Sequence, residues 1–301
     1  MVLEVKNLNK SYGRKKVLND VSFKIDVGEI LGFIGPNGAG KTTTIKLILG
    51  LQLIDSGEVI INGYDVKKDF VKAIEKVGAI VENPDAYLYL TGRKNLELIA
   101  SLYKDITKDR IKEIIKLVGL ENRIDDKVSK YSLGMRQRLG IASALLAAPN
   151  LLILDEPTNG LDPEGIKELR DLVKKLAQEG VAILISSHNL AELENFCTNV
   201  CIIKNGTVIS ENKMADLKKD SESYYEIEVS KIRGLKSLLQ KDDEIIDDNT
   251  LHVKRNKKEI AELVKEIVKK DIDIYQVKLV EASLEEAFLK ETGGNIIDKI
   301  N

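Results

Sequence analysis

The stretch that decides the fold class is Gly35-Pro36-Asn37-Gly38-Ala39-Gly40-Lys41-Thr42, which fits the pattern G-x-x-x-x-G-K-[ST]. The apolar run before it, EILGFIG (29–35), has the composition of a buried strand. The segment after it, TTTIKLILGL, has helical periodicity. A Gly-rich loop between a buried strand and a helix predicts a phosphate-binding loop. The alternative is an ordinary glycine turn with a surface lysine.

Each residue type in this loop has a chemical reason. Glycines let the backbone wrap closely around phosphate oxygens, and the positive end of the following helix faces the same anion. Lys41 is placed to reach the β- and γ-phosphates, and the Thr42 hydroxyl can bind Mg²⁺. We expect a nucleoside triphosphate to contact Gly35, Pro36, Asn37, Gly38, Ala39, Gly40, Lys41, Thr42 and Thr43.

A second motif, LLILDEP (151–157), ends a predicted buried strand in two carboxylates. Open α/β folds bind their ligands at the carboxyl edge of the sheet. Asp155 suits the Mg²⁺ shell, directly or through water, and Glu156 suits the polarisation of an attacking water. Alone, the motif is more often a strand end that meets solvent. Together with the loop it predicts a nucleoside triphosphatase.

Composition sets the outer limits on these interpretations. The 301 residues allow about two domains, and 43% hydrophobic with 31% charged residues excludes a disordered chain. The net charge of -2 argues against general nucleic-acid binding. The longest mostly apolar stretch, 141–154, is too short to span a bilayer, and MVLEVKNLNK lacks the apolar core of a signal peptide. We therefore expect a cytosolic protein.

The two cysteines, Cys197 and Cys201, are four residues apart. Two thiols on one helix face can hold part of a metal site, but a tetrahedral zinc site needs more ligands nearby. The only histidines are His188 and His252. We expect both cysteines to be small core residues in a reducing compartment.

The first two-thirds of the chain has the rhythm of an α/β domain with a largely parallel sheet. Asn205-Gly206 predicts a hairpin between CIIK and TVIS. We assign residues 1–219 to this domain. The predicted strands are 21–25, 29–35, 58–62, 151–155 and 181–186, and the predicted helices include 42–51, 67–77, 93–104 and 109–118.

A polar run at 218–223 predicts a linker, and residues 220–301 form the second predicted domain. The predicted order is strand 224–230, helix 234–240, strands 244–247 and 250–254, helix 257–270, strand 274–280 and helix 283–291. The first six elements spell β-α-β-β-α-β, so we expect a small α+β, ferredoxin-like domain over about 223–280.

Over about residues 2–215 the chain resembles the ATP-binding subunits of ABC transporters. The marker is Tyr131-Ser132-Leu133-Gly134-Met135, where the family pattern is Leu-Ser-Gly-Gly-Gln. Ser132 and Gly134 match, while the other three positions differ. The alternative is a plain helix with Ser132 as its N-cap. The resemblance implies a RecA-like α/β core with an N-terminal antiparallel β part and a helical subdomain. It also implies that Ser132 and Gly134 touch the γ-phosphate of ATP held by the opposite subunit.

Other positions of the family occur in the expected order. Tyr12 matches the aromatic residue that stacks on adenine, with a half-exposed turn tyrosine as the alternative. Asp162, in Thr158–Asp162, resembles the loop that passes signals across the ATPase dimer interface, and it also suits a helix N-cap before Pro163. His188 matches the switch histidine that contacts the γ-phosphate. The resemblance therefore adds Tyr12, Asp162 and His188 to the predicted site.

One position departs from the family. Glu82 stands where most members have glutamine, in the loop that links the catalytic core to the helical subdomain. Glutamine offers an acceptor and a donor, whereas ionised glutamate only accepts. Glu82 can still hold Mg²⁺ or orient water. Glu82, the YSLGM segment and the terminal LEEAFL segment together resemble one branch of the family. This branch contains the exporter ATPases for bacitracin resistance and lantibiotic self-protection.

The resemblance also implies partners. We expect two copies to meet head to tail and to hydrolyse Mg²⁺-ATP for a separate membrane permease, on the inner face of the cell membrane. The segment Tyr87-Leu88-Tyr89-Leu90, near Arg93, is predicted to meet that permease, with an ordinary core segment as the alternative. The competing hypotheses are a soluble ABC ATPase that acts on DNA or ribosomes, and a P-loop kinase or motor.

Overall fold

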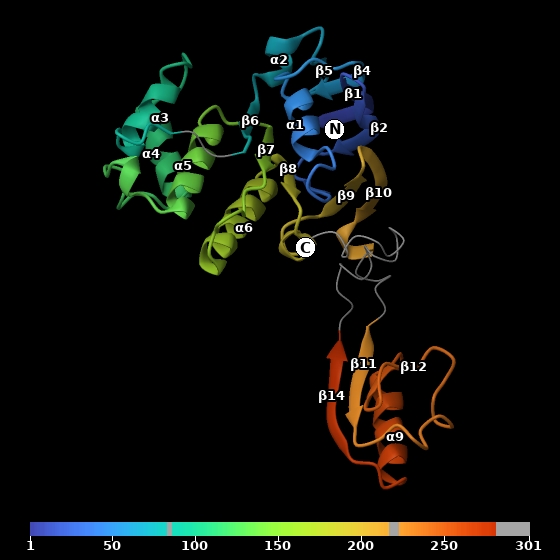
Figure 1. Ribbon diagram of the computed structural model, residues 1–301. Coiled ribbons are helices and arrows are strands. Elements are labelled where there is room, and N and C mark those ends of the chain that lie inside the picture. Colours follow the sequence, from blue (N-terminus) through green and yellow to red (C-terminus); the bar gives the residue numbers. More distant parts are fainter. Residues whose placement is uncertain (83–85, 217–222, 281–301) are drawn as a thin grey trace. The chain divides into compact units, whose positions relative to one another are not determined.

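The computed structural model describes residues 1–82, 86–216 and 223–280, and its chain divides into two compact units, Met1–Met214 and Ala215–Asn301. The predicted boundary between residues 219 and 220 lies outside the described residues, as does the predicted helix at 283–291. Figure 1 shows both units.

The first unit is built on a six-stranded sheet in the order β10-β9-β3-β8-β7-β6. Neighbouring strands from β9 to β6 are parallel, and β10 is antiparallel to β9. Strands β3, β7 and β8 are buried along their whole length, which explains their unbroken apolar sequences. The strands are β3 (Ile30–Ile34), β6 (Val77–Ile80), β7 (Leu151–Asp155), β8 (Ala182–Ser187), β9 (Asn199–Lys204) and β10 (Thr207–Lys213).

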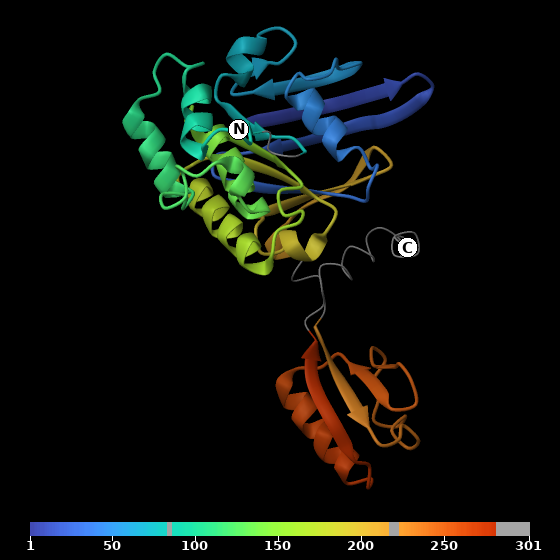
Figure 2. The same ribbon diagram turned by 60° about the vertical axis from the view of Figure 1, so that its left-hand side comes forward.

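A second, antiparallel sheet has the order β2-β1-β4-β5, from strands β1 (Leu3–Tyr12), β2 (Lys15–Ile25), β4 (Ser56–Ile61) and β5 (Tyr64–Asp65). In Figure 2 it lies above the mainly parallel sheet. Alternate residues of both sheets meet in one apolar core, where the rings of Phe23 and Phe33 lie 5.1 Å apart between centroids. Helix α1 (Lys41–Ile48) contributes Ile45 and Ile48 to the same core, so this core fixes α1 at the end of β3.

The helical part of this unit lies beyond strand β6, at the left of Figure 1. It consists of α3 (Gly92–Ala100), α4 (Lys108–Leu117), the 3-10 turn η1 (Val128–Lys130) and α5 (Leu133–Leu145). Thr91, Thr107 and Ser132 cap α3, α4 and α5, because each side-chain oxygen accepts a backbone N–H of the first turn. Helix α6 (Pro163–Gln178) and the short α7 (Leu190–Leu193) complete the unit.

The helix predicted at 67–77 is wrong in its bounds, because α2 covers only Phe70–Ile74 and Val77 begins β6. The Asp65 side chain accepts the N–H of Lys67 at 2.7 Å, which forms a turn where the helix was expected. Both cysteines are buried, as predicted, and burial raises the pKa of the Cys197 and Cys201 thiols. In the described part of the chain, no helix is long and apolar enough to cross a bilayer.

The second unit is a four-stranded antiparallel sheet in the order β12-β13-β11-β14. Its strands are β11 (Tyr224–Val229), β12 (Glu244–Ile245), β13 (Thr250–Val253) and β14 (Ile274–Val280), and its helix is α9 (Lys257–Val268). The helix predicted at 234–240 is wrong, because these residues form turns and Gly234 is left-handed (φ 101°). Leu235 is still buried in the apolar core. The unit therefore has the predicted strands and second helix of a β-α-β-β-α-β unit without the first helix.

The predicted hairpin at Asn205-Gly206 is confirmed, and it supports the phosphate loop. The Gly206 N–H donates to the Ala39 carbonyl at 3.0 Å. Gly206 has φ +78°, and a β-carbon there would lie 2.1 Å from the Val17 carbonyl oxygen. Only glycine fits this contact between the hairpin and strand β2.

We expect Gly206→Ala to lower the free energy of unfolding of the first unit. The left-handed backbone costs about 1 kcal/mol, and overpacking adds about 1–3 kcal/mol. Gly63→Ala is the matched control, since Gly63 has φ +83° and nothing within 4 Å of its β-carbon position. Urea unfolding followed by circular dichroism compares the two variants. Equal losses would show that the contact with Val17 costs nothing.

Candidate functional site

The loop between β3 and α1 is shaped by its glycines. Gly38 and Gly40 have φ angles of 80° and 110°, in the left-handed region that favours glycine. A β-carbon on Gly35 would lie 2.2 Å from the Ile203 carbonyl oxygen. The chain thus turns directly from strand β3 into helix α1. The backbone N–H groups in the first turn of α1, which have no partner within the helix, lie next to the loop. Thr43 lies half-buried in that turn.

Lys41, the first residue of α1, folds back over the loop. Its ammonium donates to the carbonyl oxygens of Gly35 at 2.6 Å and Pro36 at 3.4 Å. The side chain is only 6% exposed. A buried ammonium next to backbone turns with free N–H groups is a site for a polyanion.

Asp155, at the end of β7, forms hydrogen bonds with helix α1 and with strand β8. The Thr42 hydroxyl donates to Asp155 Oδ2 at 2.9 Å, and the Ser186 hydroxyl donates to Asp155 Oδ1. Ser186 in turn accepts the N–H of Glu156 at 2.9 Å. The sequence analysis missed Ser186, although its place at the end of the predicted strand 181–186, beside the strand that ends at Asp155, could have indicated it.

The Glu156 carboxylate joins the predicted catalytic residues. Its Oε1 lies 3.2 Å from Lys41 Nζ and its Oε2 lies 2.8 Å from His188 Nδ1. Glu156 also has φ +49°, an unfavourable angle for a side chain of this size. A strained backbone of this kind is found where the surrounding structure fixes a functional residue. The fold thus brings Lys41, Glu156 and His188 together from three separate motifs.

Glu82 lies just after β6 and faces helix α1. Its carboxylate pairs with Lys46 Nζ at 2.8 Å, and this hydrogen bond is the main reason that the pKa of Lys46 is raised. Asp155 and Tyr12 raise it further, while partial burial lowers it. The sequence analysis missed Lys46. Its position four residues after Thr42, on the same face of the helix, was the available signal.

Tyr12 ends strand β1 with its ring half-exposed. Its hydroxyl donates to the Gln52 side-chain oxygen, and Lys10 Nζ lies 5.4 Å from the ring centre. Both contacts were absent from the sequence analysis. They fix an aromatic ring at the edge of the same unit, with part of its surface open to a planar ligand.

Ser132, Gly134 and Asp162 form a second group at the N-termini of α5 and α6. Ser132 caps α5 by accepting the Met135 N–H at 3.3 Å, and Asp162 caps α6 by accepting the Gly165 N–H at 2.8 Å. Within the described ranges, no hydrogen bond or ion pair joins this group to Lys41, Glu156 or His188. Within the described residues, one chain therefore presents two sets of predicted ATP contacts that are not bonded to each other.

The loop, the buried lysine and the paired carboxylates define a P-loop nucleoside triphosphatase. Residues 18–159 match the model of the ABC transporter family. The chain is 45% identical over 293 residues to the uncharacterized ABC transporter ATP-binding protein YhcH of Bacillus subtilis, covering 97% of this chain and 96% of that protein. It is 40% identical over 302 residues to the bacitracin transport ATP-binding protein BcrA of Bacillus licheniformis, covering 98% and 99%.

Among solved structures, an ATP-binding subunit of an ABC transporter superposes with a TM-score of 0.66 at 35% identity, covering 73% of this chain and 93% of that one. The chain belongs to the ATP-binding proteins of ABC transporters. The predicted family and the resemblance to a bacitracin exporter ATPase are thereby confirmed. As an ABC ATP-binding subunit, the protein hydrolyses ATP and works with a membrane permease.

Proposed function

We propose that two copies of the chain form a two-fold dimer with ATP at the shared seam. Each nucleotide lies between Gly35–Thr43 of one copy and the Ser132, Gly134 and Asp162 group of the other, and Tyr12 stacks on its adenine. The absence of any hydrogen bond or ion pair between the two sets, within the described residues of one chain, supports this arrangement. Helix N-termini attract phosphate, and the same pair of surfaces is used twice across a two-fold axis.

The observation that carries the proposal is the Glu156 carboxylate between Lys41 and His188. Glu156 accepts a proton from the attacking water. The water oxygen then bonds to the γ-phosphorus as the bond from phosphorus to the ADP oxygen breaks. Lys41 offsets the phosphate charge, and His188 holds the carboxylate in place from its other side. The difference in dimer affinity between the ATP and ADP states supplies the motion.

Mg²⁺ fits this site, because the Thr42 hydroxyl and the Asp155 carboxylate are hard oxygen ligands only 2.9 Å apart. The residues that would hold the ion are Thr42 and Asp155, with Glu82 as a third ligand. In the described residues, no group of three His, Cys, Asp or Glu side chains is arranged for a metal, so phosphate oxygens and water would complete the shell. The ion neutralises charge on the β- and γ-phosphates.

Glu82→Gln tests the third ligand. The amide loses both the charge that attracts Mg²⁺ and the ion pair with Lys46, so we expect the Mg²⁺ concentration for half-maximal binding of a fluorescent ATP analogue to rise about tenfold. Lys46→Met frees the carboxylate and is expected to shift the same concentration downward. Titrating Mg²⁺ at fixed analogue concentration measures both shifts. An unchanged Mg²⁺ dependence in Glu82→Gln would remove Glu82 from the metal site.

The surface that meets the permease is proposed to be the segment Tyr87–Leu90. Tyr87, Leu88 and Tyr89 are exposed, and the rings of Tyr87 and Tyr89 pack edge to face at 5.8 Å between centroids. The buried Asn95 amide accepts the Tyr87 N–H at 2.8 Å and donates to its carbonyl at 3.2 Å. Exposed aromatic residues on a fixed backbone suit a short partner helix. With such a contact, the protein would lie on the inner face of the cell membrane.

The cargo is proposed to be a peptide antibiotic or a similar compound that is exported, because the bacitracin transport protein BcrA matches nearly the whole chain. Transport relatives do not favour action on DNA or ribosomes. The test is to purify the protein with its permease in lipid and to measure ATP turnover with candidate peptides, with nucleic acid and with neither. Stimulation by a peptide supports the proposal, and stimulation by nucleic acid without the permease overturns it.

A further inference from the structure

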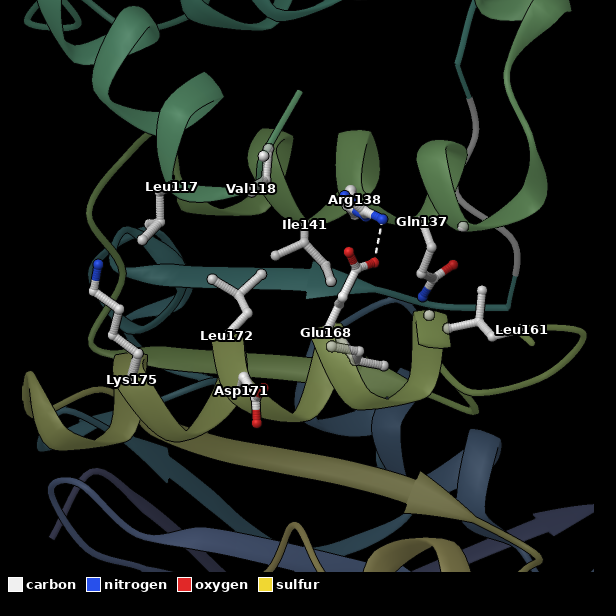
Figure 3. Close-up of a pocket in the computed structure, with 14 residues that line it drawn as sticks. Leu117, Val118, Gln137, Arg138, Ile141, Leu161, Glu168, Asp171, Leu172 and Lys175 are labelled. Atoms are coloured by element: carbon white, nitrogen blue, oxygen red, sulfur yellow. Dashed lines mark hydrogen bonds and ion pairs between the residues drawn. The ribbon is translucent and has the colours of Figure 1, made fainter. Parts of the chain in front are cut away.

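A cleft of about 340 Å³ separates helices α5 and α6. Figure 3 shows its walls, with α5 above, α6 below and the end of α4 at one side. The side chains that line the cleft include Leu117, Gln137, Arg138, Ile141, Glu168 and Leu172. A void of this size means that the two helices have little side-chain packing between them along this stretch.

Near Ser132, the N-terminal turn of α5 lies close to Gly160 and Leu161, the residues just before α6. A β-carbon on Gly160 would lie 2.5 Å from Leu133 Cδ2, and one on Gly134 would lie 3.7 Å from Leu161 Cδ2. These contacts join the two capped helix ends that carry Ser132 and Asp162. A single region of contact leaves the two helices free to rotate about it. A second contact, farther along α5 and α6, is needed to fix the angle between them.

Arg138 and Glu168 supply that contact. Figure 3 shows them pointing toward each other across the cleft, where their side chains form an ion pair. Arg138 lies six residues beyond Ser132, and Glu168 lies six residues beyond Asp162. At 1.5 Å per residue, each is about 9 Å along its helix from the cap. The ion pair therefore joins the two helices at equal distances from their N-terminal caps, Ser132 and Asp162.

Other polar groups in the cleft do not make this bridge. Gln137 is 7% exposed, and its amide forms no hydrogen bond with any residue that the structure describes. Arg110, which does not line the cleft, donates to the carbonyl oxygen of Leu145 at 2.9 Å and so joins α4 to α5 but not to α6. Among the described residues that line the cleft, Arg138 and Glu168 thus join α5 to α6 directly, with side chains that are 29% and 43% exposed.

We propose that Arg138 and Glu168 are positioning residues for ATP hydrolysis. Their ion pair holds the Ser132–Gly134 end of α5 and the Asp162 end of α6 in one fixed arrangement, so that both reach the nucleotide of the opposite subunit together. Neither residue touches the nucleotide. The inference rests on the proposed dimer and adds to it a device within each subunit that aligns the two trans-acting segments.

Charge reversal and its repair test the proposal on the full-length chain. We expect Arg138→Glu and Glu168→Arg each to lower kcat at least about tenfold, because small displacements of positioned groups cost this much or more. The Kd of each chain for a fluorescent ATP analogue stays within about twofold, since the loop around Lys41 is untouched. The double variant Arg138→Glu/Glu168→Arg restores the pair and recovers most of kcat.

Lys175→Glu is the control, because Lys175 lines the same cleft and makes no ion pair within the described residues. It should leave kcat, Kd and the Tm unchanged. Unaltered kcat in both single variants overturns the inference. So does a loss of kcat with a matching loss of Tm that the double variant does not repair, since that marks a general packing role. Failure of the protein to dimerise with ATP, measured by light scattering with Glu156→Gln, overturns the proposed dimer, and the inference falls with it.

Discussion

Glu156→Gln should bind ATP and hydrolyse it about 10²- to 10⁴-fold more slowly than the native protein, because a general base contributes about that much to the rate. The amide keeps the size of the side chain but has no affinity for the proton of the attacking water. It also removes a negative charge beside the γ-phosphate. We therefore expect ATP binding to be retained or strengthened, and the dimer to persist because its bound ATP is not consumed.

Three measurements on the same sample check this expectation. Phosphate release gives turnover, calorimetry gives ATP affinity, and light scattering gives the mass of the complex with ATP. Glu179→Gln, at the exposed C-terminal end of α6, is the matched control and should behave like the native chain. Undiminished hydrolysis in Glu156→Gln would remove this residue as the base, while slow hydrolysis by a monomer would contradict the shared site.

The sequence was most informative where chemistry and periodicity agreed. The loop 35–42, the strand that ends at Asp155 and the hairpin at Asn205-Gly206 could all be predicted, because unbroken apolar strands and glycine turns leave few alternatives. The pairing of Lys41 with Glu156 followed from the two motifs, whereas the presence of His188 beside them was implied only by family resemblance. Their distances depend on how three strands align side by side, which no local pattern encodes.

The errors have local causes. The apolar residues of segment 234–240 have helical spacing, but Gly234 adopts a left-handed backbone angle. Leu235 is buried in the core although the segment forms turns rather than a helix. At Glu82, the spacing of Lys46 from Thr42 places Lys46 on the right face of the helix, but its pairing with a carboxylate thirty-six residues later forms only in the folded chain. Single side-chain partners across the sheet edge were the part of the site that reasoning from sequence missed.

Removing the Lys41 ammonium should have the largest effect after that of Glu156→Gln. We expect this effect on ATP binding rather than on turnover. Charge-assisted hydrogen bonds are worth about 1.5–3 kcal/mol, so we expect Lys41→Ala to weaken ATP binding by about 10- to 100-fold. The same change leaves the Gly35 and Pro36 carbonyls and the Glu156 carboxylate without their donor. A lower Tm is therefore expected as well, and it must be separated from the loss of affinity.

Lys41→Met makes that separation, because methionine keeps most of the apolar stem and fills the space without the charge. If the ammonium acts on phosphate, both variants lose affinity by calorimetry, while Lys41→Met keeps more of its Tm. Lys112→Met, on the exposed face of α4, is the control for loss of one positive charge. Unchanged ATP affinity in both Lys41 variants would contradict the assignment of the loop, since a phosphate cradle without its lysine has lost the group that neutralises the γ-phosphate.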